Sequence, residues 1–136
     1  MKISKIKSIE ILDSRARPTL CTTVYLDDGS TGQAMVPSGA STGQLEAYEL
    51  RDKNDQRYGG LGVQNAVKNS EEALKILKGV SSEDQLIVDN KLIELDATEN
   101  KSKLGANAIL SVSLACARAA SNLSLIHISE PTRRTQ

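Results

Sequence analysis

The spacing of the hydrophobic residues changes once along this chain of 136 residues, and the change limits the folds that it can form. Up to residue 36, apolar and polar side chains alternate, which is typical of half-buried strands. After residue 43 the apolar residues recur at intervals of three or four, which is the spacing of amphipathic helices. Strands followed by helices favour a single α+β domain, for which this length is sufficient.

The first part of the chain predicts a three-stranded antiparallel meander. Residues 3–12 are rich in isoleucine and contain no Gly or Pro, and residues 19–26 alternate cleanly, so both segments are predicted to be strands. Residues 27–29 (Asp-Asp-Gly) are typical of a hairpin turn, because Gly readily adopts the positive φ that such turns need. Residues 30–36 then return as the third strand.

About four helices are predicted in the second part. They are expected at residues 44–51, 63–77, 83–96 and 105–121. Ser82 and Gln85 have the spacing of a capping box at the start of the third helix, and Gly79 ends the second. The last helix is rich in Ala and Ser, so neighbouring elements can approach it closely on several sides.

The composition disfavours several classes of function. Seventeen basic and seventeen acidic residues give no formal net charge, and Lys and Arg do not cluster, so nucleic acid is not an expected partner. There is no run of 18 apolar residues, so no membrane span is expected. Because Phe and Trp are absent, the core must be aliphatic. Cys21 and Cys116 lack metal-site or redox spacing and are predicted to be buried, reduced thiols.

Residues 36–43 (Val-Pro-Ser-Gly-Ala-Ser-Thr-Gly) are the one stretch that looks suited to binding or catalysis. The two glycines allow positive φ and a close approach of the backbone to a ligand. The hydroxyls of Ser38, Ser41 and Thr42 offer oxygen atoms, but the stretch carries no base, acid or cation. Acid–base chemistry at this loop therefore needs residues from outside it.

Two other interpretations of this loop are open. Residues 39–43 match G-x-S-x-G, the pattern around the nucleophilic serine of many hydrolases. That mechanism needs a histidine beside the serine and a parallel sheet, whereas this chain has one histidine, His127, and an expected antiparallel sheet. A hydrolase is therefore disfavoured, and the simpler alternative is a plain connection between a strand and a helix.

Four segments together resemble the enolase (phosphopyruvate hydratase) family, in its order and at its spacing. They are Asp13-Ser14-Arg15-x-x-Pro18-Thr19, Val36 to Gly43, Glu49-Leu50-Arg51-Asp52, and Leu95 to Leu110 (LDATENKSKLGANAIL). The similarity extends from about Ile3 to Ala120. It implies the α+β N-terminal domain of the family, and we do not expect this chain to contain the α/β barrel that follows in complete members.

The resemblance also implies an activity. Enolases dehydrate 2-phosphoglycerate to phosphoenolpyruvate in glycolysis with two Mg²⁺ ions, and their base lysine and acid glutamate lie in the barrel. No catalytic acid or base is therefore expected in this chain, which alone should be inactive. By the same resemblance the protein is cytoplasmic, and the complete enzyme is a homo-oligomer, at least a dimer.

The loop is the part of the active site that the resemblance assigns to this chain. It implies a mobile lid over the substrate that consists of Ser38, Gly39, Ala40, Ser41, Thr42 and Gly43. Ser41 would supply its hydroxyl and main-chain carbonyl oxygens to the second Mg²⁺, which prefers hard oxygen ligands. For residues 13–15 the resemblance implies a contact with a barrel, although a polar strand end explains them equally well.

The chain departs from the family pattern at a few positions. Ala16-Arg17 stands where Gly-Asn is usual, so the turn there must form differently or at a cost in free energy. Ala97 and Ser111 also stand where Gly is usual, which changes the space available for helix packing.

Residues 123–136 do not resemble any part of the family. The segment from Leu123 to Arg133 (LSLIHISEPTR) matches the translation of a common transposase adapter end. We therefore expect the domain to comprise residues 1–122 and residues 123–136, which include His127, to be a non-native tail. The alternative to an enolase fragment is a non-catalytic interaction domain with the same fold.

Overall fold

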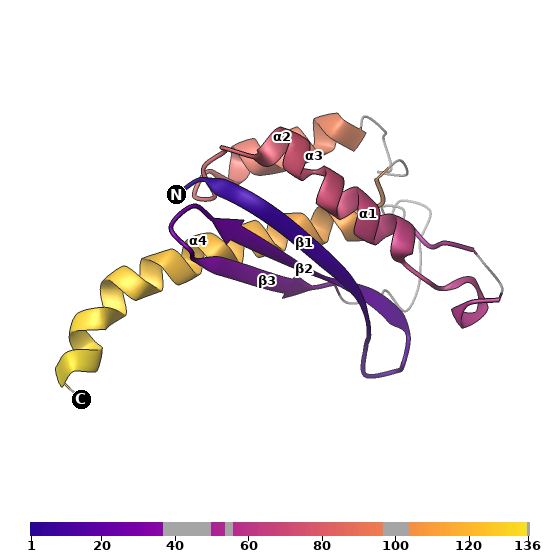
Figure 1. Ribbon diagram of the computed structural model, residues 1–136, viewed down its shortest axis with the longest axis horizontal. Coiled ribbons are helices and arrows are strands. Elements are labelled where there is room, and N and C mark those ends of the chain that lie inside the picture. The colour runs from indigo at the N-terminus through magenta and orange to yellow at the C-terminus, as the bar shows by residue number, and fades with distance from the viewer. Residues whose placement is uncertain (37–49, 54–55, 97–103, 136) are drawn as a thin grey trace.

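The computed structural model describes residues 1–36, 50–53, 56–96 and 104–135, with side chains as far as Asn122. Its sheet has three antiparallel strands in the order β1-β2-β3 (Figure 1). The strands are β1 (Ile3–Leu12), β2 (Pro18–Leu26) and β3 (Thr31–Met35). The predicted three-stranded meander is confirmed.

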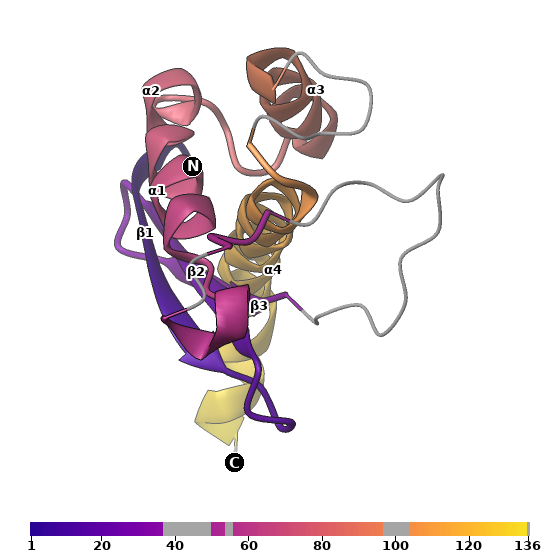
Figure 2. The same ribbon diagram turned by 90° about the vertical axis from the view of Figure 1, so that its right-hand side faces the viewer.

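Helices make up most of the remaining chain. They are the 3₁₀-helix η1 (Tyr58–Gly60) and the α-helices α1 (Gln64–Glu72), α2 (Leu74–Leu77), α3 (Gln85–Asp96) and α4 (Ala106–Thr135). Helix α4 lies across one face of the sheet against β2 and β3, α1 lies against β1, and α3 packs on α4 (Figures 1 and 2). Strands followed by helices in one packed unit confirm the α+β class.

Two helix boundaries differ from the prediction. The second predicted helix is divided into α1 and α2 at Ala73, whose N–H is shared between the carbonyls of Asn69 and Ser70, at 3.3 Å each. The predicted end of the last helix near Ser121 is wrong, because α4 continues to Thr135. No Gly or Pro stands between residues 106 and 130 to end it.

The predicted capping box at Ser82 is also wrong. The Ser82 N–H and hydroxyl both donate to the carbonyl of Met1, at 3.0 and 3.4 Å, so this residue is engaged with the start of the chain. The carboxylate of Asp84 instead accepts the N–H of Ile87, at 3.4 Å. The helix predicted at 44–51 falls largely outside the described residues, and its last two residues, Leu50 and Arg51, are not helical.

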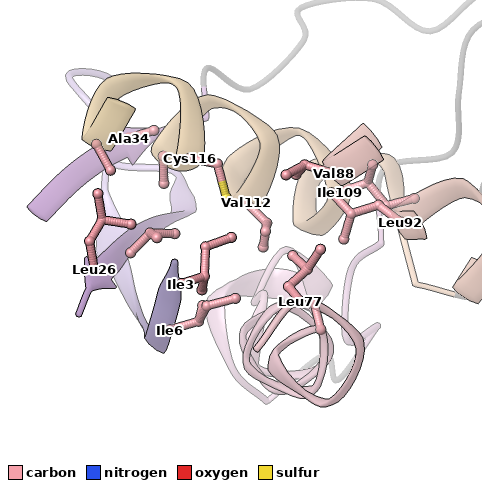
Figure 3. Close-up of a cluster of buried hydrophobic side chains, with 14 of the residues drawn as sticks. Ile3, Ile6, Leu26, Ala34, Leu77, Val88, Leu92, Ile109, Val112 and Cys116 are labelled. Carbon is pink, nitrogen blue, oxygen red and sulfur yellow. The ribbon is translucent and has the colours of Figure 1, made fainter. Parts of the chain in front are cut away.

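The core is aliphatic, as predicted from the absence of Phe and Trp. Its main cluster lies between α4, the sheet, α2 and α3 (Figure 3). It includes Ile3, Ile6, Val24, Leu26, Leu77, Val88, Leu92, Ile109 and Val112. A smaller cluster of Leu20, Val36, Val63, Ala66 and Ala108 lies beneath the end of the sheet where β3 ends.

Both cysteines are buried and neither forms a disulfide, as predicted. Burial raises the pKa of the Cys21 thiol. Burial, and to a smaller extent the negative charge of Asp89, raises the pKa of Cys116 to about 12. Both thiols are therefore protonated at neutral pH and serve as packing groups.

Helix α4 approaches β3 at backbone distance. A Cβ atom at Gly32 would lie only 2.1 Å from the main-chain nitrogen of Ala119 and 2.4 Å from the carbonyl oxygen of Ala115. Neither main-chain atom can rotate away, so only glycine fits at this strand position. The small residues of α4 allow this approach, in agreement with the sequence analysis.

A chain of four buried hydroxyls connects α1, β1, β2 and α4. Ser70 donates to Ser8 at 2.6 Å, the hydroxyls of Ser8 and Thr22 are 2.8 Å apart, and Thr22 donates to Ser111 at 2.8 Å. Ser111 in turn donates to the carbonyl of Ala108, at 2.8 Å. Ser111 stands where the family usually has Gly. It fits the packing because its hydroxyl both accepts and donates a hydrogen bond.

The turn between β1 and β2 is organised by Asp13. Its carboxylate accepts the N–H groups of Arg15 and Arg17, at 2.8 and 3.0 Å. Ala16 adopts a φ of 59°, the left-handed conformation that costs an L-residue about 1–2 kcal/mol. The prediction that this turn forms differently or at a cost is therefore confirmed, and the cost arises at the position where Gly is usual.

We predict that Ala16→Gly stabilises the protein by about 0.5–1 kcal/mol, because relief of the strained φ exceeds the entropy that Gly adds to the unfolded chain. Urea unfolding followed by circular dichroism measures the change. As a control, Ala117→Gly at an exposed position of α4 should destabilise by about 1 kcal/mol. A lower urea midpoint for Ala16→Gly would contradict the assignment of strain to this turn.

Candidate functional site

The predicted lid, Ser38 to Gly43, lies within residues 37–49, outside the part of the chain that the structure describes. The roles assigned to Ser38, Gly39, Ala40, Ser41, Thr42 and Gly43 therefore stay predictions. The structure does show how the chain is held immediately before and after this segment, at Val36 and at Leu50.

The strand side of the segment is held by β2. Val36 is buried, and its N–H donates to the carbonyl of Leu20 at 3.2 Å. Its own carbonyl accepts a hydrogen bond from the hydroxyl of Thr19, which is also buried. Both main-chain polar groups of Val36 thus have partners on β2, so the chain leaves the sheet at a fixed point.

The other side of the segment is held by the first turn of α4. Asn107 accepts the N–H of Leu50 through Oδ1 at 3.1 Å and donates from Nδ2 to the Leu50 carbonyl at 3.0 Å. Gly105 makes room for this contact, since a Cβ atom there would lie 2.5 Å from the Cβ of Leu50. The φ of Gly105 is +92°, which also favours glycine.

Arg51 and Asp52 continue the attachment of the returning chain. Arg51 donates to the carbonyl of Pro18 at the start of β2 and to that of Leu61, the latter at 2.7 Å. The two carboxylate oxygens of Asp52 accept the N–H groups of Gln64 and Asn65, each at 2.9 Å. Asp52 therefore caps the N-terminus of α1, where a negative charge is favourable.

Glu10 and Arg57 form an ion pair in this region. Two guanidinium nitrogens of Arg57 donate to the carboxylate of Glu10, one of them at 2.9 Å, and the N–H of Val63 donates to it at 2.7 Å. The hydrogen bond from Arg57, with those of Val63 and the nearby positive charges, lowers the pKa of Glu10 against the opposing effect of burial. Glu10 is thus held ionised between β1 and the chain that leads into α1.

These contacts place distant parts of the sequence at one end of the sheet. Four parts of the chain meet there (Figure 1): the turn at 13–17, the end of β3, residues 50–52 and the start of α1. Described residues from three of the four segments that resemble the enolase family therefore converge (residues 13–19, Val36 and residues 50–52), and Asn107 of the fourth contacts Leu50. The sequence predicts the importance of these segments, but not that hydrogen bonds join them.

The residues at this end that hold the chain by hydrogen bonds form a frame, which comprises Glu10, Thr19, Arg51, Asp52, Arg57 and Asn107. Within the described ranges no three His, Cys, Asp or Glu residues are grouped so that they could hold a metal ion. The carboxylates of Glu10 and Asp52 are already engaged with N–H donors. What the frame can do is fix the two ends of the segment that carries Ser41.

The roles of Glu10, Arg57 and Asn107 were not predicted from the sequence. A charged residue between Ile9 and Ile11 and an amide in the first turn of a helix rich in small residues are signals that could have pointed to Glu10 and Asn107. No local signal distinguishes Arg57 from other surface arginines, because its partner is 47 residues away.

We predict that Glu10→Gln destabilises the protein by about 1–3 kcal/mol at pH 7, because Arg57 loses its charged acceptor. Since the folded pKa of Glu10 is lowered, its contribution is present at neutral pH and is lost as the pH falls through that lowered value. The difference between parent and variant in urea unfolding should therefore shrink below about pH 4. An equal difference at pH 7 and pH 3 would contradict the ion pair.

Comparisons with known proteins agree with this geometry. The family model described as the enolase N-terminal domain matches residues 3–130. Enolases of Legionella pneumophila and Methanopyrus kandleri are each 58% identical to this chain over 120 residues, which is 88% of this chain and 28% of each relative. Within the described residues, no helix is long and apolar enough to cross a membrane. The chain spans little more than a quarter of the relatives' length and belongs to the enolase family, of which it represents the N-terminal domain.

Proposed function

We propose that this chain is the N-terminal part of a cytoplasmic, glycolytic enolase that converts 2-phosphoglycerate to phosphoenolpyruvate. The observation that supports it is the frame at the end of the sheet. Leu20 and Thr19 hold Val36, Asn107 holds Leu50, and the segment between these two points carries Ser41. A substrate lid needs this arrangement, because a segment that moves must return to the same place.

The proposed metal role of Ser41 agrees with its chemistry. A hydroxyl and a main-chain carbonyl are both hard, neutral oxygen ligands, which Mg²⁺ accepts readily. Bound Mg²⁺ would stabilise the negative charge that develops on the substrate carboxylate. The contribution of this chain would then be to bring two oxygen ligands to the Mg²⁺ on a segment with fixed ends, and to exclude water when the segment closes.

The remainder of the reaction is assigned to the barrel of the complete enzyme. Removal of the C2 proton and loss of the 3-hydroxyl need a base and an acid, and we propose that neither comes from residues 1–122. In the complete protein we also propose a homo-oligomer, at least a dimer. The alternative, a non-catalytic interaction domain with the same fold, would need no barrel at all.

We predict that the purified chain does not form phosphoenolpyruvate, and that a complete enzyme regains activity when residues 1–120 replace the matching part of the Legionella pneumophila relative. In that enzyme, Ser41→Ala should lower turnover about ten- to a thousandfold, since one of several charge-stabilising contacts is lost. The Mg²⁺ concentration needed for half-maximal activity should rise. A matched control is Ser4→Ala, at an exposed position of β1.

Three results would oppose this assignment. Covalent labelling of Ser41 by a fluorophosphonate would indicate a nucleophile, because a ligand serine has no neighbouring base to activate it. A swapped enzyme that is active but shows unaltered Mg²⁺ dependence after Ser41→Ala would remove the metal role. A folded swapped enzyme without activity would favour the interaction domain.

We also propose that the domain ends at Asn122 and that residues 123–136 are a non-native tail. The adapter-like sequence from Leu123 to Arg133 supports the proposal. Deletion of Leu123 to Gln136 is therefore expected to change the free energy of unfolding by less than about 0.5 kcal/mol. A clear fall of the urea midpoint would show that the tail packs on the domain. Deletion from Ala115 onward, which removes core residues, is the positive control.

A further inference from the structure

Within the part of the chain that the structure describes, strand β3 is at the edge of the sheet, with β2 on one side only. The N–H of Val36 donates to the carbonyl of Leu20, and the alternation of an antiparallel pair then fixes which groups of β3 face β2. The main-chain groups that point away from β2 belong to Thr31, Gln33 and Met35. Such a row is a template on which a strand of another molecule can pair.

The sequence of β3 has none of the usual protection against such pairing. Edge strands commonly carry a Lys, another charged residue or a Pro. Residues 31–35 are Thr-Gly-Gln-Ala-Met, without charge and without Pro. The side chain of Met35 is also 58% exposed, so the open face next to this edge is partly apolar.

Two side chains of α4 donate hydrogen bonds to carbonyls of β3 that point away from β2. Arg118 donates from Nη1 to the carbonyl of Gln33 at 2.9 Å. Asn122 donates from Nδ2 to the carbonyl of Thr31 at 2.8 Å. Both side chains are exposed, so the two hydrogen bonds lie at the surface, where an incoming strand would have to replace them.

The spacing of helix and strand explains why both contacts form. Four residues of a helix advance about 6 Å, and two residues of a strand advance about 6.8 Å. Residues 118 and 122 of α4 therefore lie beside residues 33 and 31 of β3, respectively. The backbone contact at Gly32 holds the two elements close enough for these side chains to reach around the edge. The next position in this series is Leu114, which has no donor for the carbonyl of Met35.

The opposite edge of the sheet is also occupied by groups from the helical half of the chain. The N–H of Ser8 on β1 donates to the carboxylate of Glu71 on α1, at 3.3 Å. Nearer the start of β1, the N–H of Ile3 donates to the carbonyl of Val80 at 2.9 Å. An acceptor thus meets an outward N–H on β1, and donors meet two outward carbonyls on β3.

We propose that Arg118 and Asn122 close the free edge of the sheet and prevent β3 from pairing with β3 of a second copy of this chain. Without these donors, two copies related by a two-fold axis can align their β3 strands antiparallel and form one continuous sheet. The two side chains then have a role that does not depend on catalysis.

The test removes both donors in the full chain with Arg118→Ala/Asn122→Ala. The weight-average mass from sedimentation should rise with concentration and approach twice that of the parent at a few hundred micromolar, because the bare edges pair. Hydrogen exchange at the amides of Thr31, Gln33 and Met35 should slow at the same concentrations. The matched control, Lys68→Ala/Asn90→Ala, loses the same types of group at exposed helix positions and should behave as the parent.

A third substitution tests whether the two copies associate through the edge of β3. The N–H of Gln33 points away from β2, so Gln33→Pro removes an outward donor without breaking the ladder. Added to the double variant, it should return the mass to that of the parent. A mass that does not rise in the double variant, or a rise that survives Gln33→Pro, overturns the proposal.

If circular dichroism shows that the double variant is unfolded, the single variants Arg118→Ala and Asn122→Ala carry the test, because each removes one donor to the edge. The mass of at least one of them should exceed that of the parent at the same concentrations. If both single variants fold and keep the mass of the parent, the proposal is overturned.

Discussion

The packing of α4 on the sheet is the contact on which the rest of this domain depends. It is possible because Gly32 lacks a side chain where the backbone of Ala115 and Ala119 passes. This approach covers one face of β2 and β3 with a helix rich in small residues. It also brings the hydroxyl of Ser111 to Thr22. A larger residue at position 32 would separate the two layers and disturb all of these contacts at once.

Polar groups buried by this packing are satisfied within the protein. The hydroxyls of Ser70, Ser8, Thr22 and Ser111 form one chain across four elements, and no buried polar side-chain atom in the described residues lacks a hydrogen-bond partner. A slip of a strand by one residue would break this chain, because its side chains would face the other side of the sheet. The aliphatic core supplies most of the burial, and the hydroxyls favour one alignment of its layers.

The same packing connects the core to the proposed active-site segment. Asn107 is in the first turn of α4, so the helix that covers the sheet also holds Leu50 at the end of residues 37–49. Glu10 on β1 binds Arg57 and Val63, and Asp52 caps α1. The segment with Ser41 thus begins and ends on the rigid part of the domain. Such an attachment suits a lid, which needs mobile residues between immobile ends.

The sequence by itself determined the three strands, the aliphatic core, the family and the segment proposed to bind metal, because each is expressed in local spacing or in runs of neighbouring residues. It also located the cost of the turn at Ala16, since positive φ is a local property. Only the tertiary structure decided that Asp84 and not Ser82 caps α3, and that Asn107 holds Leu50. Glu10, Arg57, Arg118 and Asn122 acquire their roles from partners 47 to 91 residues away. No local pattern records such pairs, because they form only once the layers have packed.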